Sequence, residues 1–210
     1  MRNVSISRRK FIAGTAAGTA AASGLLPPVT FSQEGRTLNA RLVRDIQVLD
    51  PGYMIGGSEI DTQWAIFPRL ARTLAGDKWR WEPSPYVEQI GHIDDTHIGF
   101  ELKSGLQWSD GFGELTAEDV KFSFERLKDS EWKGKWETLD HVEITGRYSG
   151  TVVLNKPFSP IWLTAITRIG VIMCKAAFEK KGITQFTTEL PAQLGPYRLR
   201  EWRPKERLIL

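Results

Sequence analysis

The sequence predicts an α/β fold in a globular chain that follows an N-terminal export signal. Of the 210 residues, 41% are hydrophobic and 25% are charged, which is ordinary composition for a globular protein. Short apolar runs separated by turn residues indicate several hairpins, and one stretch combines a helix-start signal with a helical apolar stripe. The basic excess of the chain is confined to its N-terminal segment.

The charge of the chain is unevenly distributed. The whole sequence has 28 Lys and Arg against 25 Asp and Glu, a formal charge of +3. Residues 1–32 hold four of the basic residues and no acidic one, which leaves 24 basic and 25 acidic residues in 33–210. The body of the protein is therefore near neutral, which disfavours a nucleic-acid binder. The single cysteine, Cys174, excludes an intramolecular disulfide and a multi-cysteine metal site.

Residues 1–32 are predicted to be a signal peptide. A basic start is followed by a weakly apolar run rich in Ala, Gly and Thr, and then by small residues at a cleavage site. The string Ser7–Ile12 resembles the twin-arginine export signal, so Arg8 and Arg9 are its candidate recognition residues and the twin-arginine translocase is an expected partner. Cleavage is expected after Ser32, with Ala20–Ala22 as the alternative. No cysteine near the cut offers a lipid anchor, so the domain 33–210 is expected to be soluble and periplasmic.

The first part of this domain is expected to hold strands and one helix. Residues 36–48 alternate loosely and are predicted to form the first strand. Ser58 as N-cap, with Asp61 at the third helical position, predicts a helix that Pro68 ends. Hairpins are expected over residues 70–81 and 87–102.

The helix predicted over 117–128 has the strongest local signals. Thr116 is a good N-cap, and acidic residues in the first turn favour the positive end of the helix dipole. Val120, Phe124 and Leu127 make one apolar stripe. Beyond this helix we expect strands at 142–145 and 151–154, a short helix from Ser159, a buried strand at 169–173, a helix over 175–181 closed by Gly182, and a hairpin from Tyr197 to the last residue.

Four motifs, in this order, resemble the family 5 extracellular solute-binding proteins, the exported receptors of peptide, oligopeptide and nickel ABC importers. They are Leu49–Pro51, Phe100–Gly105 followed by Trp108–Gly111, Leu115–Phe124, and Gly195–Leu199 followed by Glu201–Trp202. The resemblance spans residues 36–210. Phe112–Glu114 and Gln193–Leu194 depart from the family pattern and indicate a divergent branch.

The resemblance implies a two-lobed α/β fold of the periplasmic-binding-protein type, of which 33–210 would form the N-terminal part of lobe one. It implies a receptor that binds a peptide or similar small solute between its lobes and delivers it to an ABC permease and ATPase. No catalytic or cofactor motif is present in the sequence, so neither an enzyme nor a cofactor is expected. Two alternatives stay open: a protein that sequesters haem, a metal complex or a signalling peptide, and, less favoured, an exported hydrolase or redox enzyme.

Four residues are candidate ligand contacts. Tyr53 and Met54 follow the first predicted strand, at the carboxyl end where α/β clefts form. The resemblance to nickel-binding relatives places Trp136 and Arg168 near positions that line the cleft, where an arginine can pair with a carboxylate. The run His92–His97 is interpreted as a turn rather than a metal site, because Asp side chains cap their own backbone in turns.

Overall fold

The computed structural model describes residues 38–53, 55–74, 76, 80–187 and 189–210. The predicted signal peptide with Arg8 and Arg9 lies outside these residues, as does the candidate Met54. The chain divides into two compact units, one ending at Ala40 and one spanning Arg41–Leu210. Every helix and strand described below belongs to the second unit.

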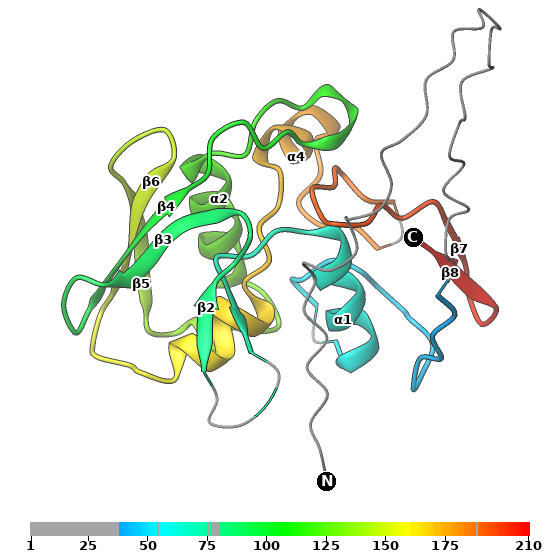
Figure 1. The fold of residues 1–210 in the computed structure, drawn as a ribbon, viewed down its shortest axis with the longest axis horizontal. Coiled ribbons are helices and arrows are strands. Elements are labelled where there is room, and N and C mark those ends of the chain that lie inside the picture. The colour runs from blue at the N-terminus through cyan, green and yellow to red at the C-terminus, as the bar shows by residue number, and fades with distance from the viewer. Residues whose placement is uncertain (1–37, 54, 75, 77–79, 188) are drawn as a thin grey trace, which may run out of the picture. The chain divides into compact units, whose positions relative to one another are not determined.

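The largest sheet of the second unit has four antiparallel strands in the order β3-β4-β6-β5 (Figure 1). The strands are Val87–His92 (β3), His97–Leu102 (β4), Leu139–Ile144 (β5) and Ser149–Leu154 (β6). Both edge strands carry a β-bulge, between Val87 and Gln89 on β3 and between Leu139 and His141 on β5. The predicted hairpins over 87–102 and 142–154 are therefore confirmed.

Helix α2, Ala117–Leu127, packs against β5 beside this sheet (Figure 1). Its predicted stripe of Val120, Phe124 and Leu127 is buried in the same core as Val142 and Val152 of the sheet. Burying such a side chain contributes about 1.5–3 kcal/mol relative to leaving it exposed. The predicted helix is thus confirmed in position and in orientation.

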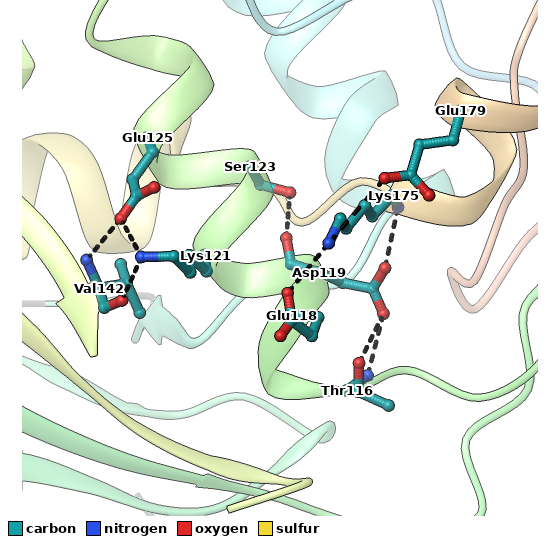
Figure 2. Close-up of polar contacts among 9 residues, drawn as sticks. All are labelled: Thr116, Glu118, Asp119, Lys121, Ser123, Glu125, Val142, Lys175 and Glu179. Atoms are coloured by element: carbon teal, nitrogen blue, oxygen red, sulfur yellow. Dashed lines mark hydrogen bonds and ion pairs between the residues drawn. The ribbon is translucent and has the colours of Figure 1, made fainter. Parts of the chain in front are cut away.

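The start of α2 also joins a second helix. Thr116 and Asp119 form a capping box, in which the backbone N–H of Thr116 donates to the Asp119 carboxylate at 2.9 Å. Figure 2 shows the same carboxylate accepting the backbone N–H of Lys175, also at 2.9 Å, at the start of helix α4 (Lys175–Lys181). Burial raises the pKa of Asp119, and these hydrogen bonds oppose the rise. The Leu115–Phe124 motif therefore starts α2 and ties it to α4.

Removing the Thr116 hydroxyl should weaken this helix start. We expect Thr116→Ala to lower the free energy of unfolding by about 1 kcal/mol, because one side of the capping box is lost. Urea unfolding followed by circular dichroism measures the change. Thr145→Ala is the matched control, since its hydroxyl lies in an exposed turn, and it should change stability by less than about 0.5 kcal/mol. Equal midpoints for Thr116→Ala and the wild type would contradict this role.

The N-terminal elements differ from the prediction in two places. Helix α1, Gly57–Ile66, has Gly56 rather than Ser58 as its N-cap, because Glu59 at the third helical position accepts the Gly56 backbone N–H at 3.2 Å. The strand predicted over 36–48 is wrong for its described part, 38–48, which joins no ladder. The hairpin predicted over 70–81 is confirmed, as β1 (Ala71–Thr73) paired with β2 (Trp81–Pro83).

The C-terminal half holds one clear correction. The strand predicted over 169–173 is wrong: Ile169 ends the π-helix η2 (Trp162–Ile169), and Val171 makes only an isolated bridge with Arg69. The residues are buried as expected, but beyond Ile169 they form an irregular segment with one bridge, so burial of an apolar run does not by itself make a strand. The remaining elements are η1 (Ser109–Gly111), α3 (Lys133–Trp136), β7 (Glu201–Arg203) and β8 (Arg207–Ile209).

Two other C-terminal predictions are confirmed. Helix α4 ends at Lys181, and Gly182 closes it in the left-handed conformation with φ 61°. The predicted terminal hairpin is present as β7 and β8, shorter than expected. None of the helices in the described part of the chain combines the length and hydropathy that a membrane-spanning segment needs.

Candidate functional site

The loop that follows Leu49 is held by a buried carboxylate. Asp50 is fully buried and accepts the backbone N–H groups of Gly52 at 2.7 Å and Phe186 at 2.9 Å. The Arg126 guanidinium of α2 donates to the same carboxylate at 2.5 Å, and lies over the Phe178 ring. The Leu49–Pro51 motif is therefore anchored to α2 and to the segment after α4.

Tyr53 extends from this anchored loop. Its hydroxyl donates to Gln185 Oε1 at 3.1 Å, and its backbone carbonyl accepts the indole N–H of Trp132 at 2.7 Å. Both rings are partly exposed. The backbone N–H of Glu131 also donates to the Gly52 carbonyl, so the segment before α3 runs alongside the loop.

Trp136 lies in the core instead. It has 0% exposure, and its ring centroid is 4.8 Å from that of Phe124 on α2. Its indole N–H has no hydrogen-bond partner among the described residues. The resemblance places this ring near positions that line the cleft, but the structure buries it, because the single turn of α3 directs position 136 inward. Trp132, four residues earlier, is the tryptophan that reaches the Tyr53 loop.

Arg168 lies at the surface, in the last turn of η2. In the part of the chain that the structure describes, its guanidinium forms no ion pair. Its backbone carbonyl accepts the indole N–H of Trp64 at 3.0 Å. The Arg69 guanidinium lies over the Trp64 ring, 4.2 Å from its centroid, and donates to the Thr167 carbonyl. Burial lowers the pKa of Arg69 to about 10, which leaves it charged at neutral pH.

Two of the predicted residues, Tyr53 and Arg168, each bond to a tryptophan that lies outside the predicted set. The Tyr53 loop bonds to Trp132 at the start of α3, α3 contacts η2, and the end of η2 presents Arg168 beside Trp64. The structure brings these residues together as two pairs, Tyr53 with Trp132 and Trp64 with Arg168. We call the four residues together the candidate binding face. Trp64 is not among the residues predicted from sequence, and no local pattern marks its bond to Arg168. Two hollows of the described residues do not include these four side chains: one is lined by charged side chains and a histidine, and the other by charged, polar and aliphatic side chains.

Comparison with known proteins decides the family. Residues 91–210 match the family model of the bacterial extracellular solute-binding proteins, family 5 Middle. The chain belongs to this family. The resemblance seen in the four sequence motifs is thereby confirmed. No curated protein sequence matches the chain.

Solved structures share the fold of this family 5 protein. The binding protein MoaA of A. tumefaciens R10, solved with mannopinic acid, is 24% identical with a TM-score of 0.67, over 79% of this chain and 34% of that one. AppA, the oligopeptide-binding protein of Bacillus subtilis solved with a nonapeptide, is 22% identical with a TM-score of 0.66, over 77% and 33%. NikZ of Campylobacter jejuni, solved with Ni(L-His), is 22% identical with a TM-score of 0.59, over 79% and 32%. The chain spans about a third of the length of these proteins.

Two features considered from the sequence, the cysteine and possible metal ligands, can be assessed in the described residues. Burial raises the pKa of the Cys174 thiol to about 11, so the thiol stays protonated and is a poor nucleophile. No group of three or more His, Cys, Asp or Glu side chains in the described ranges is placed to hold a metal ion. The family consists of solute-binding proteins rather than enzymes, in line with the expectation from sequence.

Proposed function

We propose that this family 5 protein is an exported receptor of an ABC importer, which binds a peptide or similar small solute and delivers it to the membrane permease. The proposal rests on the family match over residues 91–210. The solved relatives hold a nonapeptide, mannopinic acid and Ni(L-His), so the expected ligand is a small polar solute.

The candidate binding face would form part of one wall of the ligand site. Tyr53 and Trp132 offer partly exposed aromatic rings on which a ligand can pack. Arg168 offers a guanidinium with no ion-pair partner in the described part of the chain, and such a group binds a carboxylate through two parallel hydrogen bonds. Met54, next to Tyr53, stays part of this proposal. Trp136 is buried against Phe124 of α2, so in this proposal it packs in the core and does not contact the ligand.

The binding proposal predicts a specific loss on removing one charge. Calorimetry with the nonapeptide of the AppA complex, mannopinic acid and Ni(L-His) should identify a ligand. Arg168→Gln should then weaken its binding by about tenfold or more, because a hydrogen bond to a charged group contributes about 1.5–3 kcal/mol. Arg147→Gln is the matched control, since Arg147 is an exposed arginine paired with Glu114 in the β5–β6 turn.

The outcomes separate the alternatives. Equal weakening by both arginine variants would remove Arg168 from the site. Binding of none of the three solutes would contradict the proposed ligand class. Tight binding without uptake of the same solute by cells would favour sequestration over transport.

Export is proposed to use the twin-arginine pathway through residues 1–32. Replacing both Arg8 and Arg9 by lysine should leave the precursor in the cytoplasm, because lysine lacks the planar guanidinium fork. Cell fractionation followed by immunoblotting measures this. Arg2→Lys, outside the pair, should be exported normally. Export of the double variant at the wild-type level would rule out the twin-arginine assignment.

A further inference from the structure

Three aromatic side chains from separate elements meet beside the sheet. The indole N–H of Trp162, the first residue of η2, donates to His92 Nε2 on β3 at 2.6 Å. The two rings meet edge to face, with centroids 5.2 Å apart. The Trp162 ring also stacks on Trp81 of β2, with a centroid distance of 3.8 Å and an interplanar angle of 7°. One hydrogen bond therefore joins η2 to the sheet, and a ring stack joins it to the β1–β2 hairpin.

The hydrogen bond requires one protonation state of His92. An indole N–H can only donate, so His92 Nε2 must present its lone pair. The other ring nitrogen, Nδ1, lies 3.1 Å from the backbone carbonyl of Asp94, which can only accept. These two contacts fit a neutral imidazole with its hydrogen on Nδ1. A second proton on Nε2 would place its N–H group opposite the indole N–H of Trp162, so neither could accept and the hydrogen bond would be lost.

The His92 ring has few bonded neighbours. The imidazole is exposed, and histidine changes charge near physiological pH. Among the described residues, only the Trp162 indole and the Asp94 carbonyl bond to this ring. Several charged groups on the neighbouring elements are engaged elsewhere or lie apart in the described structure. Glu82 of β2 pairs with Arg72, His97 of β4 pairs with Asp94, and Arg168 lies at the far end of η2.

The turn between β3 and β4 should stay intact while His92 titrates. Asp94 accepts the backbone N–H groups of Thr96 at 2.8 Å and His97 at 2.9 Å, which confirms the turn predicted from the sequence. The Thr96 N–H, followed by the His97 side chain, lowers the pKa of Asp94 to about 2. Asp94 and Asp95 are the acidic groups of this turn. A change near neutral pH therefore reports on His92 and its contact with Trp162 rather than on loss of the turn.

The element held by this contact has an uncommon geometry. Helix η2 is a π-helix over Trp162–Ile169, and the Thr167 hydroxyl bonds to the Trp162 carbonyl five residues earlier at 2.7 Å. π-Helical segments are rare and are often found at functional sites. Trp162 is the first residue of this helix, and Arg168 of the candidate binding face lies in its last turn.

We propose that the His92–Trp162 contact is a pH-sensitive latch: neutral His92 holds the first turn of η2 against β3, and protonation of His92 releases it. The latch is a property of the chain by itself and does not depend on the identity of a ligand.

Nuclear magnetic resonance of the ¹⁵N-labelled 210-residue chain from pH 8 to pH 5 tests the latch. The Trp162 indole N–H resonance, assigned with Trp162→Phe, should move upfield in step with titration of the His92 ring protons. Amide exchange in the first turn of η2, corrected for intrinsic pH dependence, should accelerate about tenfold, as expected for loss of one hydrogen bond. His92→Gln keeps a carbonyl acceptor for the indole but cannot titrate, so its Trp162 resonance should stay constant.

His97→Gln is the matched control, because it removes the other titratable histidine of the hairpin and should leave the Trp162 transition in place. Titration of the wild-type His92 ring without any change at Trp162 would overturn the latch, even if a variant failed to fold. The same Trp162 transition in His92→Gln would also overturn it.

Discussion

Replacing Asp50 with alanine is expected to lower the free energy of unfolding by about 3–5 kcal/mol, because it leaves the partly buried charge of Arg126 without its partner. The Asp50 carboxylate has 0% exposure and the Arg126 side chain 14%. The substitution would also free the backbone N–H groups of Gly52 and Phe186 inside the protein. Arg126 Nη1 already has no hydrogen-bond partner in the described structure, so the loss of Asp50 would leave a second nitrogen of this guanidinium without its acceptor.

Chemical denaturation of wild type and variant measures this loss. Glu189→Ala is the matched control: its ion pair with Lys181 is exposed, with 87% of the glutamate side chain in solvent, and it should contribute no more than about 1 kcal/mol. The double variant Asp50→Ala/Arg126→Met should recover part of the loss, because it removes the unpaired charge as well. Similar losses for Asp50→Ala and Glu189→Ala would show that Asp50 does not anchor the loop.

Replacing Gly195 with alanine should lower the free energy of unfolding by a similar amount, because the added Cβ atom would clash with the backbone of α1. A Cβ atom at this position would overlap the Ala65 carbonyl oxygen and lie 2.5 Å from Ile66 Cα. These are backbone atoms of α1, so no side chain can rotate away. The residues around Gly195 also bond to this helix end, Leu194 N–H to Ile66 O at 3.2 Å and Tyr197 N–H to Ala65 O at 3.0 Å. We expect a loss of about 3 kcal/mol from overpacking and displaced hydrogen bonds.

Thermal unfolding of Gly195→Ala measures this effect. Gly134→Ala is the matched control, because a Cβ at Gly134 in α3 meets no atom within 4 Å, and alanine favours a helix by up to about 1 kcal/mol. Gly134→Ala should therefore melt at or above the wild-type temperature, and Gly195→Ala well below it. Equal melting temperatures for the two variants would mean that the Gly195–Leu199 motif does not pack closely on α1.

The helices that could be predicted from sequence are those with a strong local signal at one end or along one face. Helix α2 has its cap at Thr116 and a stripe of three buried residues, and α4 has Gly182 as its left-handed end. Such signals act over one or two turns, so they need no knowledge of the rest of the fold. The start of α1 was misplaced because two acidic residues compete: Asp61 suggests Ser58 as the cap, and Glu59 forms the capping box with Gly56.

The misses depend on contacts between residues distant in sequence. An apolar run such as 169–173 indicates burial, but whether it forms a strand depends on a partner strand elsewhere in the chain, and here only Val171 finds one bridge. The candidate site shows the same limit. Tyr53 and Arg168, chosen from the sequence as candidate ligand contacts, are at least partly exposed in the structure. The burial of Trp136 depends on Phe124 of α2, and the hydrogen bond of Trp64 depends on a residue 104 positions away.

The bulges on the two edge strands of the four-stranded sheet affect the tendency of the protein to aggregate at high concentration. A straight edge strand offers a row of free N–H and C=O groups on which a second copy can add a strand, which is the first step toward insoluble aggregates. The bulge at Val87 and Gln89 on β3, and the bulge at Leu139 and His141 on β5, interrupt that row at both ends of the sheet. The fold therefore carries its own protection against growth by strand addition, and lengthening either edge into a regular strand would remove it.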